Sequence, residues 1–310
     1  MSQPAHFQST LILFASIGAF LSSATARGDI PQVYWYINGT MERIGIDGTQ
    51  RETVISNIPD GWGLDVSVAA GKVYWADRAA GRIQRANLDG SSPEVVVTGL
   101  GQPHDVLIDA AANHIYWSDT DLDKIQRADL DGSNVVDILT GVGFVTGMHL
   151  DTVNSRIYFS ESSTDTVRRV NVDGSDPVIL LSSAGLGGGD PRGVDVDLTR
   201  GHIYFSDLKQ DGIFRADLDG SNLVPFVTGL DKVFDLQILP ETDEIYWFEN
   251  TTARLYRSPL GAAIPAVVET NAAAWGMGIT PEPGSIALLA FGVVMLGRNT
   301  RVDRRNRQSE

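Results

Sequence analysis

Short stretches in which apolar and polar residues alternate recur along the chain between residues 33 and 279, and turns rich in glycine and aspartate separate them. Residues 114–133, HIYWSDTDLDKIQRADLDGS, show the pattern: a strand with two adjacent aromatic residues, a polar loop, a second strand and an Asp-Gly turn. Neighbouring side chains on a strand point to opposite faces, so the two aromatic residues each need apolar cover. Sheets stacked face to face supply this cover. The pattern therefore predicts a stack of similar sheets.

The aromatic doublet occurs six times, and the intervals between its tyrosines are 40, 42, 42, 46 and 42 residues. This period is the size of one four-stranded propeller blade. Asp-Gly turns follow the doublet in five copies, and such turns between β-rich runs are a strong hairpin signal. In the second copy we expect strands at residues 62–67, 72–76, 82–87 and 94–98. The doublets are Tyr34-Trp35, Tyr74-Trp75, Tyr116-Trp117, Tyr158-Phe159, Tyr204-Phe205 and Tyr246-Trp247.

The first copy lacks its opening strand, and a matching segment follows the last copy. Residues 274–279, AWGMGI, are similar to residues 61–66, GWGLDV, which open the second copy. A chain that begins with three strands of a blade and ends with the fourth can close a ring, whereas an open solenoid needs polar caps. We therefore predict an all-β, six-bladed β-propeller at residues 27–279, with four-stranded blades and a C-terminal strand that completes the first blade.

The copies YWAD, YWSD, YFSE and YFSD, with RADLDGS beyond them, resemble the YWTD repeats, or class B repeats, of the low-density lipoprotein receptor family. The resemblance covers residues 33–279 and implies a six-bladed β-propeller whose motif aromatic residues fill the space between blades. It also implies that the motif acid forms hydrogen bonds within and between repeats. The first and last copies, YWYI and YWFE, depart from the motif. The residues with an implied structural role are Tyr74, Trp75, Asp77, Tyr116, Trp117, Asp119, Tyr158, Glu161, Tyr204, Asp207 and Tyr246.

The N-terminal segment has the composition of an export signal. Residues 1–26 contain no Lys, Arg, Asp or Glu, and an apolar run at residues 11–21 precedes Ala24-Thr25-Ala26. An apolar run before an Ala-x-Ala cleavage site is typical of a secretory signal peptide. We therefore predict a signal peptide at residues 1–26, although its positively charged leader is missing; a buried N-terminal strand is the alternative.

The C-terminal segment has three parts in a defined order. Pro281, Glu282 and Pro283 precede an apolar run at residues 285–296, and five arginines follow the run. The run is shorter than the roughly 20 residues of a comfortable membrane span. This order resembles the PEP-CTERM sorting tail of exported bacterial proteins. The resemblance implies that residues 280–310 hold a short transmembrane segment, associate transiently with the membrane and are removed by an exosortase-type enzyme; a weak permanent anchor or a frayed end is the alternative.

Charge and cysteine content narrow the possible partners. The formal net charge of −15 disfavours binding to nucleic acid or to an anionic membrane, since both attract positive surfaces. The sequence has no cysteine, which excludes within it the cysteine-rich modules that flank the propellers of animal relatives. Together with the two end segments, these features predict a location at the bacterial cell surface or in the extracellular matrix.

The residues twelve positions before each motif tyrosine differ from copy to copy and lie at the predicted mouth of the channel. Aromatic, cationic and polar groups that converge on a concave surface are typical of a binding site. In the family that the repeats resemble, the corresponding face binds extended protein segments. We therefore predict a non-enzymatic propeller that binds a protein, peptide or glycan through its mouth; alternatively, the aromatic residues only plug the channel. The predicted ligand-binding residues are Trp62, His104, Thr146, Arg192, Phe234 and Trp275.

Four aspartates on the channel face of the opening strands indicate a second kind of site. Carboxylates around a narrow axis can hold Ca²⁺, which takes about six to eight oxygen ligands, or act as catalytic acid and base. His104 and His149 lie on the same strands, but no His-x-His or Ser-His-Asp order is present. A channel Ca²⁺ ion is therefore a hypothesis, with no other cofactor expected. A hydrolase of small esters or lactones and a purely structural matrix protein are the competing functions. The aspartates are Asp65, Asp105, Asp195 and Asp235.

Overall fold

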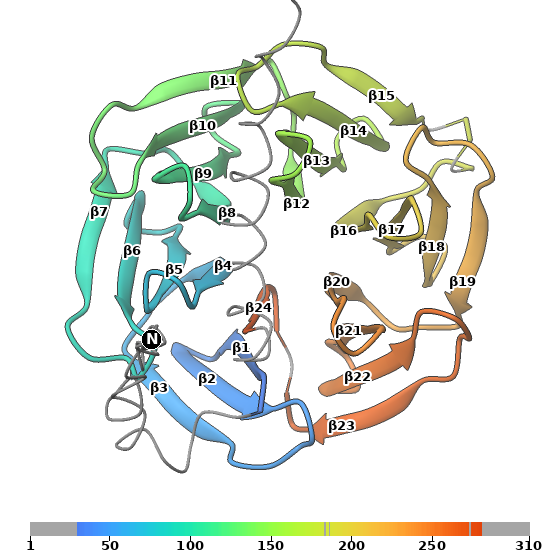
Figure 1. The fold of residues 1–310 in the computed structure, drawn as a ribbon, viewed down its shortest axis with the longest axis horizontal. Helices are drawn as coiled ribbons and strands as arrows, with labels where there is room; N and C mark the ends of the chain where they lie inside the picture. Colours follow the sequence, from blue (N-terminus) through green and yellow to red (C-terminus); the bar gives the residue numbers. More distant parts are fainter. Residues whose placement is uncertain (1–29, 183, 186, 273, 281–310) are drawn as a thin grey trace, which may run out of the picture.

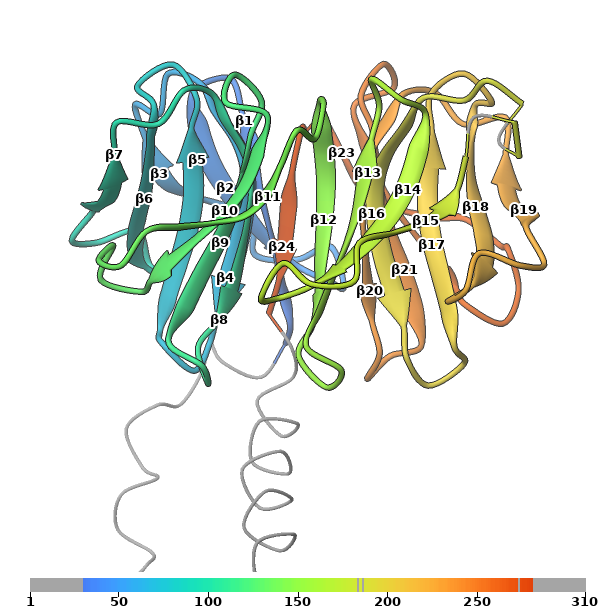
Figure 2. The same ribbon diagram turned by 90° about the horizontal axis from the view of Figure 1, so that it is seen from above.

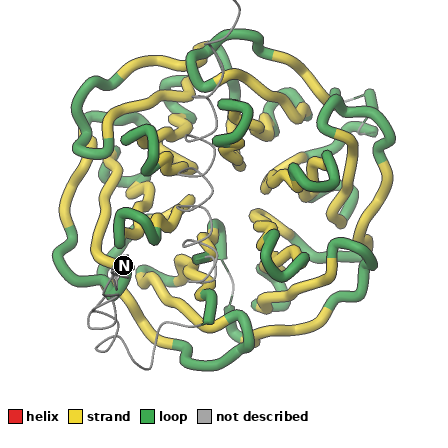
Figure 3. The backbone as a smooth tube through the Cα atoms, in the orientation of Figure 1, coloured by secondary structure: helices red, strands yellow, loops and turns green. Residues whose placement is uncertain are grey.

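The described part of the chain is a closed ring of six four-stranded antiparallel sheets around a central axis, seen along that axis in Figures 1 and 3. The prediction of an all-β, six-bladed β-propeller is confirmed, and the described residues contain no helix. The computed structural model describes residues 30–182, 184–185, 187–272 and 274–280.

The two predicted end segments lie outside the described residues. These are the signal peptide at residues 1–26 and the sorting tail with Pro281, Glu282 and Pro283. Both stay predictions from the sequence. Among the residues that the structure describes, no helix is long and apolar enough to cross a membrane.

Every blade has its strands in the same order from the axis to the rim. The first blade contains β24 (Met277–Ile279), β1 (Gln32–Ile37), β2 (Thr40–Gly45) and β3 (Glu52–Ser56). The second contains β4 (Gly61–Ser67), β5 (Lys72–Asp77), β6 (Arg82–Asn87) and β7 (Glu94–Thr98). The third contains β8 (Pro103–Asp109), β9 (His114–Asp119), β10 (Lys124–Asp129) and β11 (Val136–Thr140).

The other three blades follow the same plan. The fourth contains β12 (Val145–Asp151), β13 (Arg156–Glu161), β14 (Thr166–Asn171) and β15 (Val178–Leu181). The fifth contains β16 (Pro191–Asp197), β17 (His202–Asp207), β18 (Gly212–Asp217) and β19 (Val224–Thr228). The sixth contains β20 (Val233–Leu239), β21 (Glu244–Glu249), β22 (Arg254–Pro259) and β23 (Ala266–Thr270). We call the strand nearest the axis in each blade the inner strand and the next one, which carries the aromatic doublet, the motif strand.

The ring closes through its two terminal strands, as predicted. Strand β24 pairs antiparallel with β1, and Tyr34 lies opposite Gly278. The departing first and last motif copies fill this closure with their own side chains. The ring centroids of Trp35 and Phe248 are 5.8 Å apart at the closure. Tyr36 packs on the other side, toward the second blade, where its hydroxyl donates a hydrogen bond of 2.6 Å to the Ile58 carbonyl.

The aromatic doublets join the blades into one core. Tyr116 packs with Ile157 and Phe159 of the fourth blade, whereas Trp117 packs with Tyr74 of the second blade, so one doublet contacts both neighbours. This arrangement follows from the alternation of side chains along a strand. All the motif aromatic residues that the sequence singled out are buried.

The motif acids anchor the loops that lead into the inner strands. The Asp119 carboxylate accepts hydrogen bonds from the backbone N–H groups of Gly101 and Gln102, at 2.7 and 2.9 Å. Glu161 accepts one from Gly143 at 2.8 Å, and Asp207 accepts one from Asp190 at 3.1 Å. Asp77 instead pairs with the Arg82 guanidinium at 2.8 Å. A carboxylate satisfies backbone donors that would otherwise be buried without partners.

The Asp-Gly turns require glycine for a steric reason. Gly90 has a φ of +81°, and a Cβ atom at this position would lie 1.9 Å from the Val54 carbonyl oxygen of the neighbouring blade. The turn aspartates are exposed, and Asp89 accepts a 2.9 Å hydrogen bond from the Ser91 N–H. These turns therefore combine left-handed backbone geometry with close contact between blades.

The ring has two distinct faces, which Figure 2 shows from the side. The inner strands begin at one face, which we call the mouth face; Trp275 lies there, just before β24. The described chain ends lie at the opposite face, where the Gln32 N–H donates a 2.7 Å hydrogen bond to Thr280 Oγ1. We call this second face the terminal face.

Candidate functional site: the channel and its mouth

Six side chains form a closed belt around the mouth of the channel, which we call the mouth belt. Each belt residue contacts the next, through ring centroids 4.4 to 5.2 Å apart or through the Arg192 guanidinium carbon, which lies 5.7 and 5.9 Å from two phenylalanine ring centroids. The belt runs Trp62, His104, Phe144, Arg192, Phe234, Trp275 and back to Trp62. Aromatic and cation–π contacts of this kind favour tilted and edge arrangements, as seen here.

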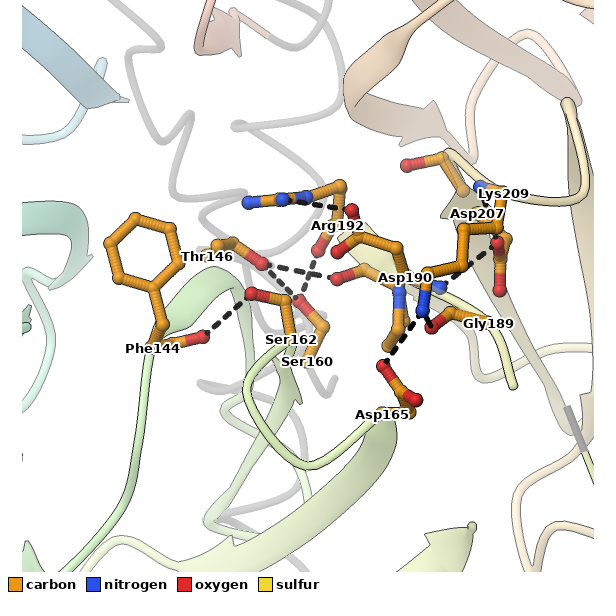
Figure 4. Close-up of polar contacts among 12 residues, drawn as sticks. Phe144, Thr146, Ser160, Ser162, Asp165, Gly189, Asp190, Arg192, Asp207 and Lys209 are labelled. Atoms are coloured by element: carbon orange, nitrogen blue, oxygen red, sulfur yellow. Dashed lines mark hydrogen bonds and ion pairs between the residues drawn. The ribbon is translucent and has the colours of Figure 1, made fainter. Parts of the chain in front are cut away.

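Five of the six mouth residues expected from the sequence lie in this belt, and Thr146 does not. Thr146 is buried, and its hydroxyl donates a 3.3 Å hydrogen bond to the Pro191 carbonyl (Figure 4). Phe144, two residues earlier, takes its place in the belt. Thr146 instead turns toward the fifth blade, and Phe144, in the loop before β12, contacts His104 and Arg192 in the belt. The register shift lies at the same place relative to the motif strand in β12 and in β8, so counting back from the motif tyrosine gives no sign of this exchange.

The outer surface of the belt is mainly apolar, and its most exposed member is Trp275, at 42%. Arg192 in the belt and Arg78 beside the belt already have polar partners, and that of Arg78 is the Gln102 side chain. Arg192 forms a 2.9 Å ion pair with Asp190. The Arg78 guanidinium lies 4.9 Å from the Trp62 ring, while Trp62 Nε1 donates a 3.0 Å hydrogen bond to Asp60. The mouth thus presents an aromatic platform with a charged rim.

His104 is the most buried member of the belt. Only 4% of its surface is exposed, and neither ring nitrogen has a hydrogen-bond partner among the described residues. Burial, together with the positive charges of Arg78 and Arg192, lowers the pKa of His104 to about 3. His104 is therefore a neutral imidazole packed between two aromatic rings at all ordinary pH values.

Beyond the belt, the channel widens into a cavity of about 190 Å³. Its polar lining comes from the four predicted channel aspartates, His149 and Gln237, and the remaining lining is mostly aliphatic. Thr152, just past the end of β12, also lines the cavity, which places the cavity toward the terminal face. The structure therefore brings all four aspartates into one space, as the sequence suggested.

Each channel aspartate connects two blades, a role that the sequence did not reveal. One carboxylate oxygen accepts the N–H of the following residue, and the other accepts an N–H from the inner strand of the next blade, at 2.6 to 2.9 Å. Asp65, for example, binds the N–H groups of Val66 and Ile108. We call this arrangement an aspartate clasp. The amides reached across the blades are those of Ile108, Met148, Ile238 and Met277.

Burial in the channel shifts the pKa values of clasp aspartates. Burial raises the pKa of Asp65 to about 6 and that of Asp105 to about 7, against the opposing effect of their amide hydrogen bonds. Burial and the nearby Asp105 charge also raise the pKa of Asp235. Burial alone would lower the pKa of His149, but its contact with Asp195 Oδ1 raises it overall. The channel thus holds protons more tightly than free carboxylates do.

Comparison with known proteins agrees with this architecture. Residues 113–141 and 201–234 match the profile of the family described as low-density lipoprotein receptor repeat class B. Two segments of the chain are therefore similar to class B repeats. The search of curated proteins gave no match.

Two solved structures show how widely this propeller shape is shared. A chain in the crystal structure of a nidogen/laminin complex is 20% identical, with a TM-score of 0.73, and the match covers 80% of this chain and 98% of that chain. Virginiamycin B lyase from Staphylococcus aureus is 15% identical, with a TM-score of 0.56, over 76% of this chain and 80% of that chain. At these identities both likenesses show the fold alone.

The channel of this propeller is a poor match to a Ca²⁺ site. Among the described residues, no group of three or more His, Cys, Asp or Glu side chains is placed to hold a metal ion. The clasps also direct both oxygens of each channel carboxylate at backbone donors, whereas Ca²⁺ needs about six to eight oxygens aimed at one point. A channel Ca²⁺ ion stays a prediction from the sequence that this geometry does not support.

Proposed function

We propose that this chain is an exported class B propeller that binds a protein segment across its mouth belt. The observation that carries the proposal is the exposure of Trp275, 42%, at the centre of an aromatic platform on the mouth face. Exposed aromatic residues inside a charged rim are typical hot spots of protein–protein interfaces. The class B repeats and the likeness to a propeller from a nidogen/laminin complex support a protein partner.

The binding test uses a phage-displayed library of random peptides, selected on the purified protein and followed by affinity measurement with the best synthetic peptide. We expect Trp275→Ala to weaken this peptide by at least about tenfold, because truncating a central aromatic anchor removes about 2 kcal/mol or more. Val153→Ala is the matched control, since Val153 is 78% exposed and lies past the end of β12 at the terminal face.

Two results would contradict the proposal. If both variants bind the peptide as the unmodified protein does, the partner does not use the mouth. If Trp275→Ala leaves binding intact but lowers the melting temperature strongly, the belt is a plug. Selective binding on a glycan array, with no peptide selected, would move the proposal from a protein ligand to a carbohydrate.

The proposed location rests on the two end segments. We propose that residues 1–26 are removed during export and that an exosortase-type enzyme recognises the tail containing Pro281, Glu282 and Pro283 at the bacterial cell surface. Mass spectrometry of protein isolated from its native host tests this. The expected product begins after Ala26 and lacks the C-terminal arginines, and an intact chain ending at Glu310 would contradict processing.

A hydrolase of small esters or lactones is the competing function, and one observation favours it. Buried acids with raised pKa values in a cavity, such as Asp65 and Asp105, are often catalytic. Burial is the main cause of these raised pKa values, and both oxygens of each carboxylate are already held by backbone amides, so we rank this function second. Turnover on a panel of esters and lactones that disappears in Asp195→Asn, in a variant that still folds, would establish the enzyme and displace the binding proposal.

A further inference from the structure

The aspartate acceptors for the backbone amides that face the channel are distributed unequally among the six blades. In an antiparallel pair every second residue of a strand turns its N–H away from the partner strand. In the inner strands these residues lie ten and eight positions before the motif tyrosine, as the clasped amides of Met148 and Ile108 show. Six inner strands with two such amides each give twelve channel-facing donors. The clasps bind eight of them.

The four amides without an aspartate acceptor form two equivalent pairs. Leu64 and Val194 are 130 residues apart, and Leu150 and Ile279 are 129 apart. The clasps repeat with the same spacing, since 130 residues separate Asp65 from Asp195 and Asp105 from Asp235. The ring therefore has an internal two-fold pattern: blades two, three and four correspond to blades five, six and one.

This pattern leaves two of the six junctions between blades without a clasp. One lies between the first and second blades, the other between the fourth and fifth, on opposite sides of the ring. At each of them glycine meets glycine. A Cβ atom on Gly276 would lie 2.9 Å from Gly63 Cα, and one on Gly147 would lie 2.9 Å from Gly193 Cα. We call these junctions the first seam and the second seam, and the three-blade units between them the half-rings.

At the clasped junctions the corresponding contact differs. A Cβ atom on Gly63 would lie 2.6 Å from Asp105 Cα, and one on Gly193 would lie 2.6 Å from Asp235 Cα. A glycine there faces an aspartate that can carry a clasp. Only at the seams do both facing residues of the two inner strands lack a side chain. There the two backbones approach closely, and no aspartate clasp joins them.

The mouth belt crosses both seams. Trp275 contacts Trp62 across the first seam, and Phe144 contacts Arg192 across the second. The second seam has further contacts, because His149 pairs with Asp195, and Thr146 donates to the Pro191 carbonyl. The first seam has its polar contacts outside the inner strands, where the Tyr36 hydroxyl donates to the Ile58 carbonyl and Arg43 Nη1 donates to the Leu88 carbonyl. Along the channel, the first seam is therefore the weaker of the two. The belt divides at the seams into two arcs of three residues, one on each half-ring.

We propose that the propeller moves as two rigid half-rings that part first at the two seams, the first more readily than the second, with the mouth belt as the latch. Opening at a seam changes the distance between the two arcs of the belt. The device would thus set the shape of the mouth, and a ligand that contacts both arcs would hold it closed. This last step rests on the proposed binding at the mouth, but the half-rings themselves do not.

Thiol labelling can measure the opening of each junction, because the chain has no native cysteine. The residue ten positions before the motif tyrosine packs into a single junction in every blade. Leu64 and Val194 pack into the first and second seams, whereas Val106 and Leu236 pack into clasped junctions. All four are at most 3% exposed. Val194→Cys and Val106→Cys therefore form one matched pair, and Leu64→Cys and Leu236→Cys form the other.

We expect the thiols of V194C and L64C to react with a maleimide at least about tenfold faster than those of V106C and L236C under native conditions, because opening at a seam breaks no clasp. L64C should react fastest. Equal rates within both pairs, or faster reaction at the clasped junctions, would overturn the proposal. Melting curves of the four variants identify any rate that reflects global unfolding.

A second set of variants tests the latch and does not depend on small differences in stability. Trp275→Ala should accelerate labelling of L64C and leave V194C unchanged, whereas Phe144→Ala should accelerate V194C and leave L64C unchanged. If either substitution accelerates all four thiols together, the ring yields as a whole and the half-rings do not exist. If neither changes any rate, the belt is not a latch. Loss of peptide binding without these changes would leave the proposed function intact and remove only this inference.

Discussion

The motif strands and the inner strands of the same blades differ in how strictly they repeat. In the motif strands, each tyrosine and its aromatic neighbour are buried in every blade and divide between the cores on either side. In the inner strands, equivalent channel positions hold glycine, aspartate, histidine or leucine. The motif strands thus give all blades one way to pack. The inner strands distinguish one blade from another, and they carry the mouth belt, the clasps and the seams.

The largest expected effect is the loss of stability when an aromatic residue of a motif strand is truncated. Trp117 is fully buried between two blades, so Trp117→Ala should lower the free energy of unfolding by about 3–5 kcal/mol through lost contacts and a cavity. Trp275→Ala at the mouth should cost less than about 1 kcal/mol. Denaturant titration of both variants checks the difference. A similar loss in both would mean that the mouth belt is part of the stabilising core.

A smaller effect separates the clasps from ordinary surface acids. Asp105→Ala removes the acceptor from the buried N–H groups of Val106 and Met148, and an unsatisfied buried donor costs about 1–3 kcal/mol. Asp131→Ala, in an exposed Asp-Gly turn, should cost well under about 1 kcal/mol. Asp105→Asn keeps one acceptor oxygen and should fall between the two. If Asp105→Ala is as stable as Asp131→Ala, the clasps do not hold the blades together.

The strands could be predicted from the sequence, whereas the clasps and one residue of the mouth belt could not. Strand positions were predicted within one residue in the second blade, because alternation and Asp-Gly turns are local signals. The clasps were not predicted, since the acceptor on Asp65 and the amide of Ile108 belong to different repeats. Phe144 was missed because it lies in the loop before β12, outside the position counted from the motif tyrosine, and because Thr146 turns toward the Pro191 carbonyl. Contacts between the inner strands of neighbouring blades produce no periodic pattern that a single sequence shows.

The pH dependence of stability sharpens the account of the channel. Folding raises the pKa of Asp65 from 3.8 to about 6 and that of Asp105 to about 7, so the folded state binds protons more tightly than the unfolded chain. Stability should therefore increase as pH falls from about 8 to about 5. The raised pKa of His149 acts in the same direction, whereas the lowered pKa of His104 opposes it below about pH 6.5, the ordinary value of that group. Melting temperatures at pH 8 and pH 5 should show a rise of a few degrees on acidification.

The matching variant identifies the source of that rise. The side chain of the Asp105→Asn variant cannot titrate, so the difference between its melting temperatures at pH 8 and pH 5 should be smaller than that of the unmodified protein. Asp47 and Asp89 have lowered pKa values because Thr49 and Ser91 donate hydrogen bonds to them, and their contribution is lost only at more acidic pH. A melting temperature that falls steadily from pH 8 to pH 5 would contradict the tight binding of protons in the channel.

The smallest expected effect concerns His104. Its two ring nitrogens are buried without a partner among the described residues, so His104→Phe should keep the packing with Trp62 and raise the free energy of unfolding by up to about 1 kcal/mol. Thermal melting checks this. A clear loss of stability would mean that bound water or another group satisfies His104, and that the belt is more polar than its contacts indicate.

The central claim is that the irregular side chains of the mouth, rather than the repeated motif, contact a partner. Backbone amide NMR with the selected synthetic peptide tests it most directly. The account predicts shift changes confined to the loops and first residues of the inner strands, around Trp62, His104, Phe144, Arg192, Phe234 and Trp275. Changes confined to the outer strands or to the Asp-Gly turns of the terminal face would contradict it.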